Sequence, residues 1–437
     1  MKILIIGSGG REHALAWKIR QSPLVTKVYC APGNPGIGEI ADLVPHKPQE
    51  IEGLLKFAIE QGIDLTVVGP EQPLVEGIAD AFEEKGLAMF GPSKAAARIE
   101  GSKVFAKEFM KAHDIPTAEF RSFDSSRRFD AERYIDEMPV PVVIKADGLA
   151  AGKGVVVCET KEGALEALAA MMDKKIFGEA GTTVVIEEFL VGEEASVLAI
   201  TDGTDFLILP PAQDHKRILD GEQGKNTGGM GAFAPAPAVD AEMLETIKRS
   251  IIRPALLGMK KDGRPFKGCL YAGLMITETG PKVVEFNCRF GDPETQVILP
   301  LLENDIVELL MGAVSGKLSG ASIRLKESVA VCVVVGSGGY PGRYATGMPI
   351  LGLDRAAEEP DVVIFHSGTA LDKGQVVTSG GRVVGVTAFG AGQTGEATVD
   401  RAYRAVRKIT FDGAYYRSDI GRKAVARLKK ISRAEVE

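Results

Sequence analysis

The sequence has few of the residues and segments that mark secreted, membrane-bound and zinc-binding proteins. It contains five cysteines, none in a Cys-x-x-Cys pair, so neither a disulfide framework nor a cysteine zinc site is expected. Its five histidines show no zinc-motif spacing. No apolar run approaches the roughly eighteen residues that a membrane helix needs, and the apolar start, Ile3 to Ile6, is too short for a signal-peptide core. We therefore expect a cytoplasmic protein with reduced thiols and no membrane partner.

A surplus of positive charge is also missing. The chain carries 52 Lys and Arg against 59 Asp and Glu, a formal net charge of −7. Proteins that bind nucleic acid through overall basicity usually carry a basic surplus, so no nucleic-acid partner is expected. Residues 401–437 are locally basic, and the better interpretation of this stretch is a solvated helix face.

Glycine is abundant, with 51 among 437 residues. Many backbone positions are thus expected to make tight turns or to approach ligands closely. The length predicts two to four domains, and a composition of 45% hydrophobic and 25% charged residues is typical of a globular enzyme.

The first hundred residues alternate short apolar runs with helical segments. The expected strands are Lys2 to Ile6, Val25 to Cys30, Leu65 to Val68 and Leu87 to Phe90. The expected helices are Arg11 to Arg20, Leu54 to Gln61 and Leu74 to Glu84. This alternation predicts an α/β domain with a doubly wound parallel sheet.

The pattern changes from Ser102. A helix to about His113 is followed by a segment, opened by Pro116, with the character of a hairpin. Further on we expect a helix at Ala164 to Met172 and strands at Val142 to Lys145, Gly154 to Cys158, Thr183 to Glu187, Leu270 to Thr277 and Lys282 to Asn287. Beyond residue 328, short Val runs such as Val329 to Val335 and Arg382 to Ala388 predict a small β-rich domain closed by a helix. The predicted domains are 1–101, 102–327 and 328–437.

A glycine-rich turn, Gly7-Ser8-Gly9-Gly10, follows the first strand. The dinucleotide-binding fingerprint requires a third glycine where this chain has Glu12, so a nicotinamide cofactor and an oxidoreductase activity are disfavoured. Glycines between a strand and a helix still expose amides to an anion. A phosphate-bearing small molecule and a purely structural turn remain equal alternatives here.

A second glycine-rich stretch, Gly148 to Gly154, differs from a P-loop. Three residues rather than four separate Gly148 and Gly152, and Gly154 instead of Ser or Thr follows Lys153. A loop of this kind between two strands can fold over nucleotide phosphates, and Lys145 at the end of the preceding strand could reach the same phosphates. A flexible hairpin with a solvated lysine is the alternative.

Acidic residues follow the strand at Thr183 to Glu187, in the stretch Glu187-Glu188-Phe189-Leu190-Val191-Gly192-Glu193-Glu194. In isolation they would indicate an exposed sheet edge. A segment linking two lobes could instead offer backbone groups to adenine and a carboxylate to ribose hydroxyls.

The strongest local pattern is Glu285-Phe286-Asn287-Cys288-Arg289-Phe290-Gly291-Asp292-Pro293-Glu294. If the strand continues through Arg289, alternation puts Glu285, Asn287 and Arg289 on one face. A carboxylate and an amide oxygen two residues apart suit Mg²⁺, which takes one or two protein oxygens and leaves the rest to phosphates and water. A half-exposed strand with no ligand is the alternative.

The last candidate is a predicted substrate loop. It consists of the polar cluster Asp214-His215-Lys216-Arg217 and the glycine-rich stretch Asn226 to Gly231. The sequence contains no Gly-x-Ser-x-Gly nucleophile motif.

Together these stretches resemble the phosphoribosylamine–glycine ligase (glycinamide ribonucleotide synthetase) family of the ATP-grasp superfamily. The matching segments are GSGGREHALAWK at 7–18, GPEQPLVEG at 69–77, KADGLAAGKGV at 145–155, EEFLVGEEAS at 187–196, AQDHKR at 212–217, NTGGMGAFAP at 226–235, LYAGLMIT at 270–277, VEFNCRFGDPETQ at 284–296, GSGGYPG at 336–342 and YRSDIG at 416–421. The family usually has Asp and Pro where this chain has Glu222 and Lys225.

The resemblance implies an N-terminal α/β domain, an ATP-grasp core with a mobile lid near 122–190, and a C-terminal β-rich domain. It implies a ligase that joins glycine to 5-phosphoribosylamine through a glycyl phosphate, with ATP and Mg²⁺ or Mn²⁺, in purine biosynthesis. A monomer is expected. An ATP-grasp ligase for another acid or amine is the alternative.

The resemblance also implies roles for individual residues. Catalytic roles fall to Lys145, Asp214 and Arg289, of which Asp214 and Arg289 would contact substrate. Metal ligands would be Glu285 and Asn287. ATP would be bound by Lys103, Lys145, Gly148, Gly152, Lys153, Gly154, Glu187, Glu188, Phe189, Leu190 and Glu194.

Overall fold

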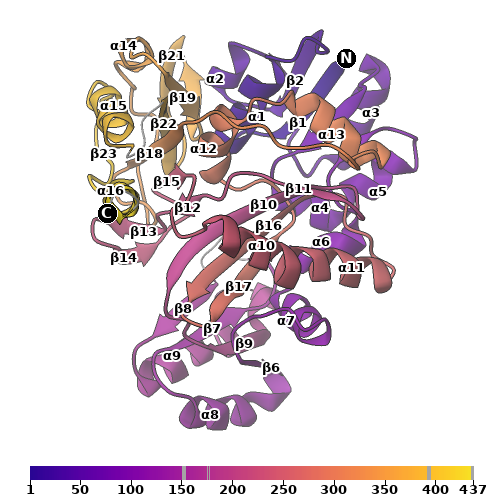
Figure 1. Cartoon of the computed structure of the whole chain (residues 1–437), viewed down its shortest axis with the longest axis vertical. Helices are drawn as coiled ribbons and strands as arrows, with labels where there is room; N and C mark the ends of the chain where they lie inside the picture. Colours follow the sequence, from indigo (N-terminus) through magenta and orange to yellow (C-terminus); the bar gives the residue numbers. More distant parts are fainter. Residues whose placement is uncertain (150–153, 175, 177, 391–394, 435–437) are drawn as a thin grey trace.

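The central strands of the N-terminal sheet, Lys2–Gly7 and Leu65–Val68, are buried on both faces (Figure 1). The computed structural model describes every residue except 150–153, 175, 177, 391–394 and 435–437. The sheet is parallel, with the order β3-β2-β1-β4-β5. Ile3 and Ile5 of β1 belong to one hydrophobic core and Leu4 and Ile6 to another, because successive side chains point to opposite faces. The strands are β1 (Lys2–Gly7), β2 (Lys27–Pro32), β3 (Asp42–Leu43), β4 (Leu65–Val68) and β5 (Met89–Phe90). The predicted doubly wound sheet is confirmed.

The helices of this domain pack around the sheet. They are α1 (Gly10–Ile19), α2 (Pro35–Gly38), α3 (Ile51–Gln61), α4 (Glu71–Glu76), α5 (Ile78–Glu83) and α6 (Lys94–Gly101). The single helix predicted for Leu74 to Glu84 is wrong, because Gly77 adopts a left-handed conformation (φ +103°) that ends α4 before α5 begins. The sequence prediction did not include α6, which leads from this domain towards the centre of the molecule (Figure 1).

An antiparallel sheet, ordered β11-β10-β16-β17, forms the centre of the molecule. Its strands are β10 (Glu193–Thr201), β11 (Phe206–Ile208), β16 (Gly268–Thr277) and β17 (Gly280–Asn287). Helical segments around it are α7 (Lys103–Ala112), α10 (Ala241–Ile247), a π-helical turn (Lys248–Ile252), α11 (Arg253–Lys261), α12 (Glu294–Leu301) and α13 (Ile306–Ser315). The predicted strand pair at 270–277 and 282–287 is confirmed as β16 and β17.

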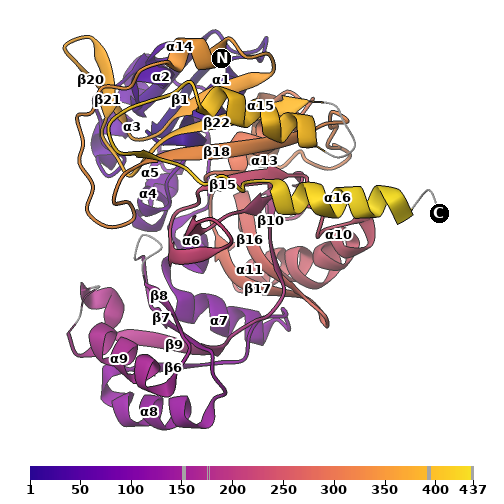
Figure 2. The same ribbon diagram turned by 90° about the vertical axis from the view of Figure 1, so that its left-hand side faces the viewer.

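A second antiparallel sheet with its own core forms the end of the molecule away from both termini, and we call it the lid (Figure 2). Its strand order is β6-β9-β7-β8. The elements are β6 (Phe120–Asp124), α8 (Arg128–Glu137), β7 (Val142–Ala146), β8 (Val155–Cys158), α9 (Lys161–Met172) and β9 (Thr183–Glu188), with 3₁₀ turns at Ser125–Arg127 and Gly178–Gly181. The predicted hairpin after Pro116 is wrong, since β6 pairs with β9 and is followed by α8.

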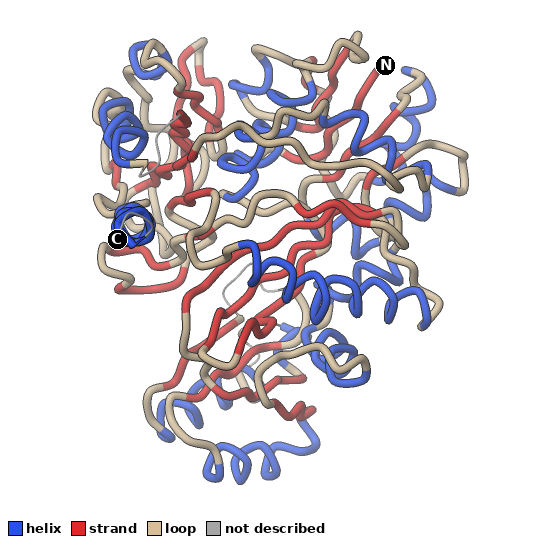
Figure 3. The backbone as a smooth tube through the Cα atoms, viewed as in Figure 1, coloured by secondary structure: helices blue, strands red, loops and turns tan. Residues whose placement is uncertain are grey.

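The C-terminal residues form a third region (Figure 3), built on an antiparallel sheet. The order β12-β15-β18-β22-β19, with β23 beside β18, shows that two strands from the middle of the chain join this sheet. The elements are β12 (Gln213–Asp214), β15 (Gly231–Ala234), β18 (Val329–Ser337), α14 (Leu353–Ala357), β19 (Val362–His366), β22 (Arg382–Gly390), α15 (Glu396–Val406) and β23 (Ala414–Tyr415), and two hairpins, β13 (Arg217–Leu219) with β14 (Gln223–Asn226) and β20 (Thr369–Asp372) with β21 (Gln375–Thr378).

The basic C-terminal segment forms helix α16 (Arg422–Ala434). Arg427 and Lys423 pair with Glu193 at the start of β10, and Lys429 pairs with Glu396 on α15. The basic side chains of α16 thus meet acidic groups of the same chain. Within the described part of the chain, no helix combines the length and the apolar character needed to cross a membrane.

Candidate active site

The three regions and the lid meet around a cleft of about 550 Å³. Its walls include residues of the N-terminal domain, α7, the lid, β17 and the C-terminal sheet. Of the sequence-predicted site residues, those that line it are Lys103, Lys145, Gly148, Gly154, Glu187, Glu188, Phe189, Leu190, Glu194, Asp214, Glu285, Asn287 and Arg289. Gly152 and Lys153 lie outside the described residues.

Two of the predicted phosphate-binding groups are lysines that approach the cleft from different elements. Lys103, the first residue of α7, donates from Nζ to the backbone oxygen of Gly148 at 2.9 Å. Lys145 on β7 pairs with Glu187 and donates to the backbone oxygen of Val284 at 3.1 Å. Burial lowers the pKa of Lys103, although nearby Glu285 acts in the opposite direction. Both lysines therefore line the same cleft, and each already has a partner within the chain.

Residues 187–194 connect the lid to the central sheet. Glu187 is buried, whereas Glu188 accepts a hydrogen bond from the backbone N–H of Glu119 at 3.1 Å and pairs with Lys282 at 3.0 Å. Gly192 is required at the turn into β10, because a Cβ there would lie 2.2 Å from the backbone oxygen of Ile276. The acidic stretch therefore links two sheets around the cleft and does not form an exposed sheet edge.

Glu194 lies further along the same wall, at the start of β10. It is exposed, and its carboxylate pairs with Lys216 at 3.0 Å. Its carboxylate is thus accessible to a ligand hydroxyl.

The predicted metal ligands lie at the end of β17. Glu285 and Asn287 both line the cleft, while Phe286 and Cys288 point into a hydrophobic core, so the predicted alternation holds even though the strand ends at Asn287. The described residues give the Glu285 carboxylate no direct hydrogen bond or ion pair. A free carboxylate and the Asn287 amide oxygen form a hard-oxygen donor pair of the kind that Mg²⁺ prefers.

Electrostatics keep Glu285 ionised. Burial acts to raise its pKa, but Lys216, Lys145, Lys103 and Arg289 together outweigh burial and lower the pKa. A cation and polyphosphate could enter this environment together, the metal facing the carboxylate and the phosphates facing the lysines. Among the described residues no group of three or more His, Cys, Asp or Glu side chains is arranged to hold a metal.

Arg289 ties this site to α4 and α6. Its guanidinium contacts Glu100 at 2.9 Å and Glu71 at 3.4 Å and donates to Asn287 Oδ1 at 3.1 Å. Burial acts to lower the pKa of Arg289, but Glu100 and Glu71 raise it overall. The guanidinium therefore stays charged and in place beside the proposed metal ligands.

Asp214 on β12 also lines the cleft. Its Oδ1 is buried without a hydrogen-bond partner among the described residues. Loss of water, followed by the nearby charge of Glu294, raises the pKa of Asp214 well above its usual range. Gly229 packs so closely that a Cβ there would lie 2.6 Å from Oδ1 and 2.4 Å from Pro293. An unpartnered acid in a narrow space suits a small cationic ligand group.

The structure adds cleft residues to which sequence reasoning gave no role. Tyr271 donates to Glu294 Oε1 at 2.8 Å, and Ser196 donates to the same oxygen at 2.9 Å. Lys107 pairs with Glu187 at 2.5 Å. Lys107 lies four residues after Lys103 and so on the same helix face, but this spacing alone does not distinguish a buried cleft lysine from a solvated one.

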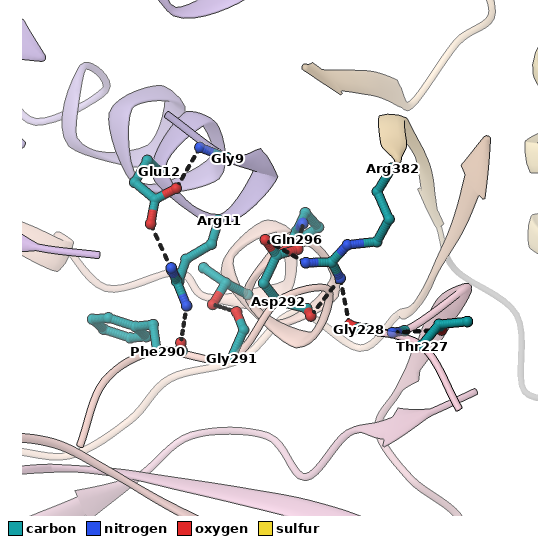
Figure 4. Close-up of polar contacts among 12 residues, drawn as sticks. Gly9, Arg11, Glu12, Thr227, Gly228, Phe290, Gly291, Asp292, Gln296 and Arg382 are labelled. Atoms are coloured by element: carbon teal, nitrogen blue, oxygen red, sulfur yellow. Dashed lines mark hydrogen bonds and ion pairs between the residues drawn. The ribbon is translucent and has the colours of Figure 1, made fainter. Parts of the chain in front are cut away.

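The loop that follows Arg289 is held from both ends of the chain (Figure 4). Arg11 of α1 donates to the backbone oxygen of Phe290 at 3.1 Å. Arg382 of β22 pairs with the Asp292 carboxylate at 3.2 Å and donates to the Asp292 backbone oxygen at 2.8 Å. Asp292 also accepts from Gln296 at 2.7 Å. Two guanidinium groups thus border the cleft at the end away from the lid.

In the glycine-rich turn beside Arg11, a side chain of the following helix α1 binds a backbone amide. Glu12 accepts a hydrogen bond from the Gly9 N–H at 2.5 Å and pairs with Arg11 at 2.7 Å. A Cβ on Gly69 would lie 1.8 Å from the Glu12 carboxylate. Glu12 therefore takes the Gly9 amide that a dinucleotide phosphate would need.

Comparison with known families matches nearly the whole chain. The phosphoribosylglycinamide synthetase N domain matches residues 1–100, the ATP-grasp (A) domain matches 101–295, and the C domain matches 330–423. A phosphoribosylamine–glycine ligase of Rhodopirellula baltica is 51% identical over 435 residues, covering 98% of this chain and 99% of the relative. The ligase of Caldanaerobacter subterraneus is 49% identical over 420 residues, covering 96% and 99%.

Solved structures show the same similarity. A phosphoribosylamine–glycine ligase from Thermotoga maritima superposes with a TM-score of 0.81 at 33% identity, covering 96% of this chain and 100% of that chain. A biotin carboxylase from Campylobacter jejuni superposes with a TM-score of 0.72 at 14% identity, covering 95% and 92%, which shows a shared fold alone.

Proposed function

The chain belongs to the phosphoribosylglycinamide synthetase family, and we propose that it joins glycine to 5-phosphoribosylamine with hydrolysis of ATP. The products are glycinamide ribonucleotide, ADP and phosphate, and the reaction belongs to purine biosynthesis. Relatives about half identical over nearly their full length carry this activity in their names. The observation that carries the proposal is the single cleft in which two lysines, a free carboxylate and a fixed guanidinium meet.

The first step is phosphoryl transfer to glycine. A carboxylate oxygen of glycine attacks the γ-phosphorus of ATP, the bond to the β-phosphate oxygen breaks, and ADP leaves. Lys103 and Lys145 neutralise the phosphates, since this chemistry depends mainly on positioning and charge stabilisation. Glu285 and Asn287 would hold Mg²⁺, or Mn²⁺ as the alternative, which would supply further charge neutralisation at the phosphates.

Glycine itself is a zwitterion and needs two contacts. Arg289 faces its carboxylate, and the unpartnered Oδ1 of Asp214 receives its ammonium group. Bringing the ammonium group to Asp214 keeps that carboxyl ionised despite its loss of water. Gly229 packs directly against this carboxylate, where a Cβ would lie 2.6 Å from Asp214 Oδ1, so a larger residue at 229 would displace it.

The second step needs no protein nucleophile. The amine of phosphoribosylamine attacks the carbonyl carbon of glycyl phosphate, a proton leaves the amine, and phosphate departs. Arg11 and Arg382 supply positive charge at the end of the cleft away from the lid, which favours a phosphate-bearing substrate there. A closed lid would exclude the water that hydrolyses an acyl phosphate.

The nucleotide contacts and domain limits are part of the same proposal. Gly148, Gly152, Lys153 and Gly154 cover the phosphates. Residues 188–190 receive adenine, and Glu194 binds the ribose hydroxyls. We keep the domains as 1–101, 102–327 and 328–437.

A cytoplasmic monomer is also proposed. One chain supplies every wall of the cleft, and the five cysteines are free and buried, as expected in a reducing compartment.

The direct test is ADP formation with glycine, with and without phosphoribosylamine generated in situ. Formation that requires both substrates supports the proposal. ADP formation with another acid or amine, and none with this pair, would favour a different carboxylate–amine ligase of the same superfamily.

A further inference from the structure

A buried ion triad joins the lid to the rest of the molecule. The Glu187 carboxylate on β9 lies between the ammonium groups of Lys145 on β7 and Lys107 on α7. Lys107 Nζ is 2.5 Å from Glu187 Oε2, and Lys145 pairs with the other oxygen. The side chains of Lys107, Lys145 and Glu187 are 3%, 5% and 5% exposed. The two lysines therefore depend on Glu187, and Glu187 on the two lysines, more than any of them depends on water.

Lys107 is anchored independently of Lys145. Its Nζ donates to Thr117 Oγ1 at 2.7 Å, and that hydroxyl donates to the backbone oxygen of Val283 on β17 at 2.6 Å. The same ammonium lies 5.6 Å from the centre of the Phe120 ring. These contacts hold Lys107 in place whichever partner Lys145 takes.

Lys145 has two competing partners once the proposed function is accepted, and the inference rests on that function. In the nucleotide-free chain its partner is Glu187, whereas a role at the ATP phosphates requires the ammonium to turn towards the polyphosphate. Glu187 would then lose one of its two cations inside the protein. A buried charge that loses its only partner is strongly destabilising, so the second cation decides whether the exchange is possible.

We propose that Lys107 is a positioning residue for ATP binding, which compensates the charge of Glu187 while Lys145 transfers from Glu187 to the phosphates. The triad has two cations for one carboxylate, and so one positive charge in excess. A polyphosphate supplies the missing anion. Without Lys107 the carboxylate would retain Lys145, and ATP would have to compete with a buried ion pair.

The test compares Lys107→Met, Lys107→Arg and a matched control. Lys18 provides the control, because it is also a buried lysine whose ammonium binds a backbone oxygen, that of Leu302, away from the cleft. Calorimetry measures the Kd of a non-hydrolysable ATP analogue with Mg²⁺, and kinetics give KM for ATP and for glycine. Melting temperature is recorded for each variant.

We expect Lys107→Met to raise the analogue Kd and the KM for ATP about tenfold or more, with the KM for glycine changed less than about twofold. Lys107→Arg keeps the positive charge, so its analogue Kd and its KM for ATP should remain near the wild-type values. Lys18→Met should lower the melting temperature without changing the analogue Kd. A folded Lys107→Met protein with unchanged analogue affinity would overturn the proposal.

A double variant separates charge compensation from simple structural support. Glu187→Gln keeps an oxygen acceptor but removes the charge, so Lys107→Met with Glu187→Gln should recover most of the lost analogue affinity. Failure to recover overturns the proposal. If Lys107→Met does not fold, the double variant decides alone, since near-normal affinity supports the proposal and weak affinity contradicts it.

Analogue binding requires neither glycine nor phosphoribosylamine. A loss of affinity in Lys107→Met therefore supports the inference even if the acid or amine of the proposed reaction is wrong. Conversely, glycine-dependent activity in the wild type together with an unchanged analogue Kd in the variant refutes the inference alone.

Discussion

Replacing Glu285 with Gln tests the proposed metal site most directly. The substitution keeps the size and shape of the side chain and removes its negative charge. In the structure this carboxylate lines the cleft among Lys103, Lys145, Lys216 and Arg289, and the described residues give it no direct partner of its own. Its charge is thus available to an incoming cation.

The expected loss follows from what remains after the substitution. Asn287 offers only a neutral oxygen, already hydrogen-bonded to Arg289 at 3.1 Å, so the divalent ion would lose its one anionic protein ligand. We expect kcat/KM to fall by ~10²-fold or more, about 2.7 kcal/mol of transition-state stabilisation. Excess Mg²⁺ should restore part of the loss, because a higher concentration raises occupancy by mass action.

The assay is a magnesium titration of ADP formation in wild type and variant, with melting measured alongside. If Glu285 only supports β17, the variant should lose thermal stability and added Mg²⁺ should not rescue it. Equal magnesium midpoints in two equally stable proteins would refute the reasoning and remove Glu285 from the site.

Three further predictions concern substrate choice, the lid and acid stability. Glycine should be used with a much higher kcat/KM than alanine, because the proposed reaction takes glycine and a pocket shaped for it excludes a methyl group by steric clash; equal values for the two acids would contradict this. Gly148→Val should raise the KM for ATP in a folded protein, because Gly148 has φ +85° and its Cβ would lie 3.2 Å from Ala180; an unchanged KM argues against the phosphate loop. Burial lowers the pKa of His13 to about 3 and of His366 to about 4, so both are neutral when folded. The free energy of unfolding should therefore fall as the pH drops from about 6.5 towards 4, by about 1.4 kcal/mol per pH unit for each histidine. Identical denaturant midpoints at pH ~7 and ~5 would exclude this destabilisation.

Short sequence patterns predicted the structure correctly where the outcome depends on the residues of a single strand. The unbroken apolar run from Ile3 to Ile6 predicts a strand buried on both faces, and the structure places alternate residues in two different cores. Likewise, the alternation around Glu285 and Asn287 predicts apolar neighbours on the other face, and Phe286 and Cys288 do belong to a hydrophobic core. In both cases the period of the strand alone determines the outcome.

Local patterns failed where the partner lies far along the chain. The segment after Pro116 has strand character, but its partner is β9, so Phe120 pairs with Glu187 rather than with a neighbouring strand. The division of the helix at Gly77 depends on one backbone conformation that a helical pattern does not encode. Pairing between distant strands is set by how the whole lid packs, which no short window of sequence contains.

The same limit explains why Lys107 was missed. A lysine four residues after Lys103 on an amphipathic helix is usually solvated, so its sequence context gives no reason to expect burial. Only the approach of β9 brings Glu187 to the helix and makes the burial possible. Individual candidate ligands can thus be predicted from the sequence. The charged side chains that the fold brings next to them, such as Lys107 beside Glu187, cannot.

The loop after Arg289 shows why the arrangement of the domains matters for the proposed chemistry. Arg11 and Arg382, more than 350 residues apart in sequence, both donate to backbone oxygens of this loop, at Phe290 and Asp292. Each guanidinium makes a charge-assisted hydrogen bond that holds the loop in one geometry. Glu285 and Asn287 lie directly before this loop on the same chain segment, so the first and third regions of the protein jointly position the proposed metal and substrate ligands. The three regions therefore have to assemble correctly before the site can form, although both proposed metal ligands, Glu285 and Asn287, belong to the central region.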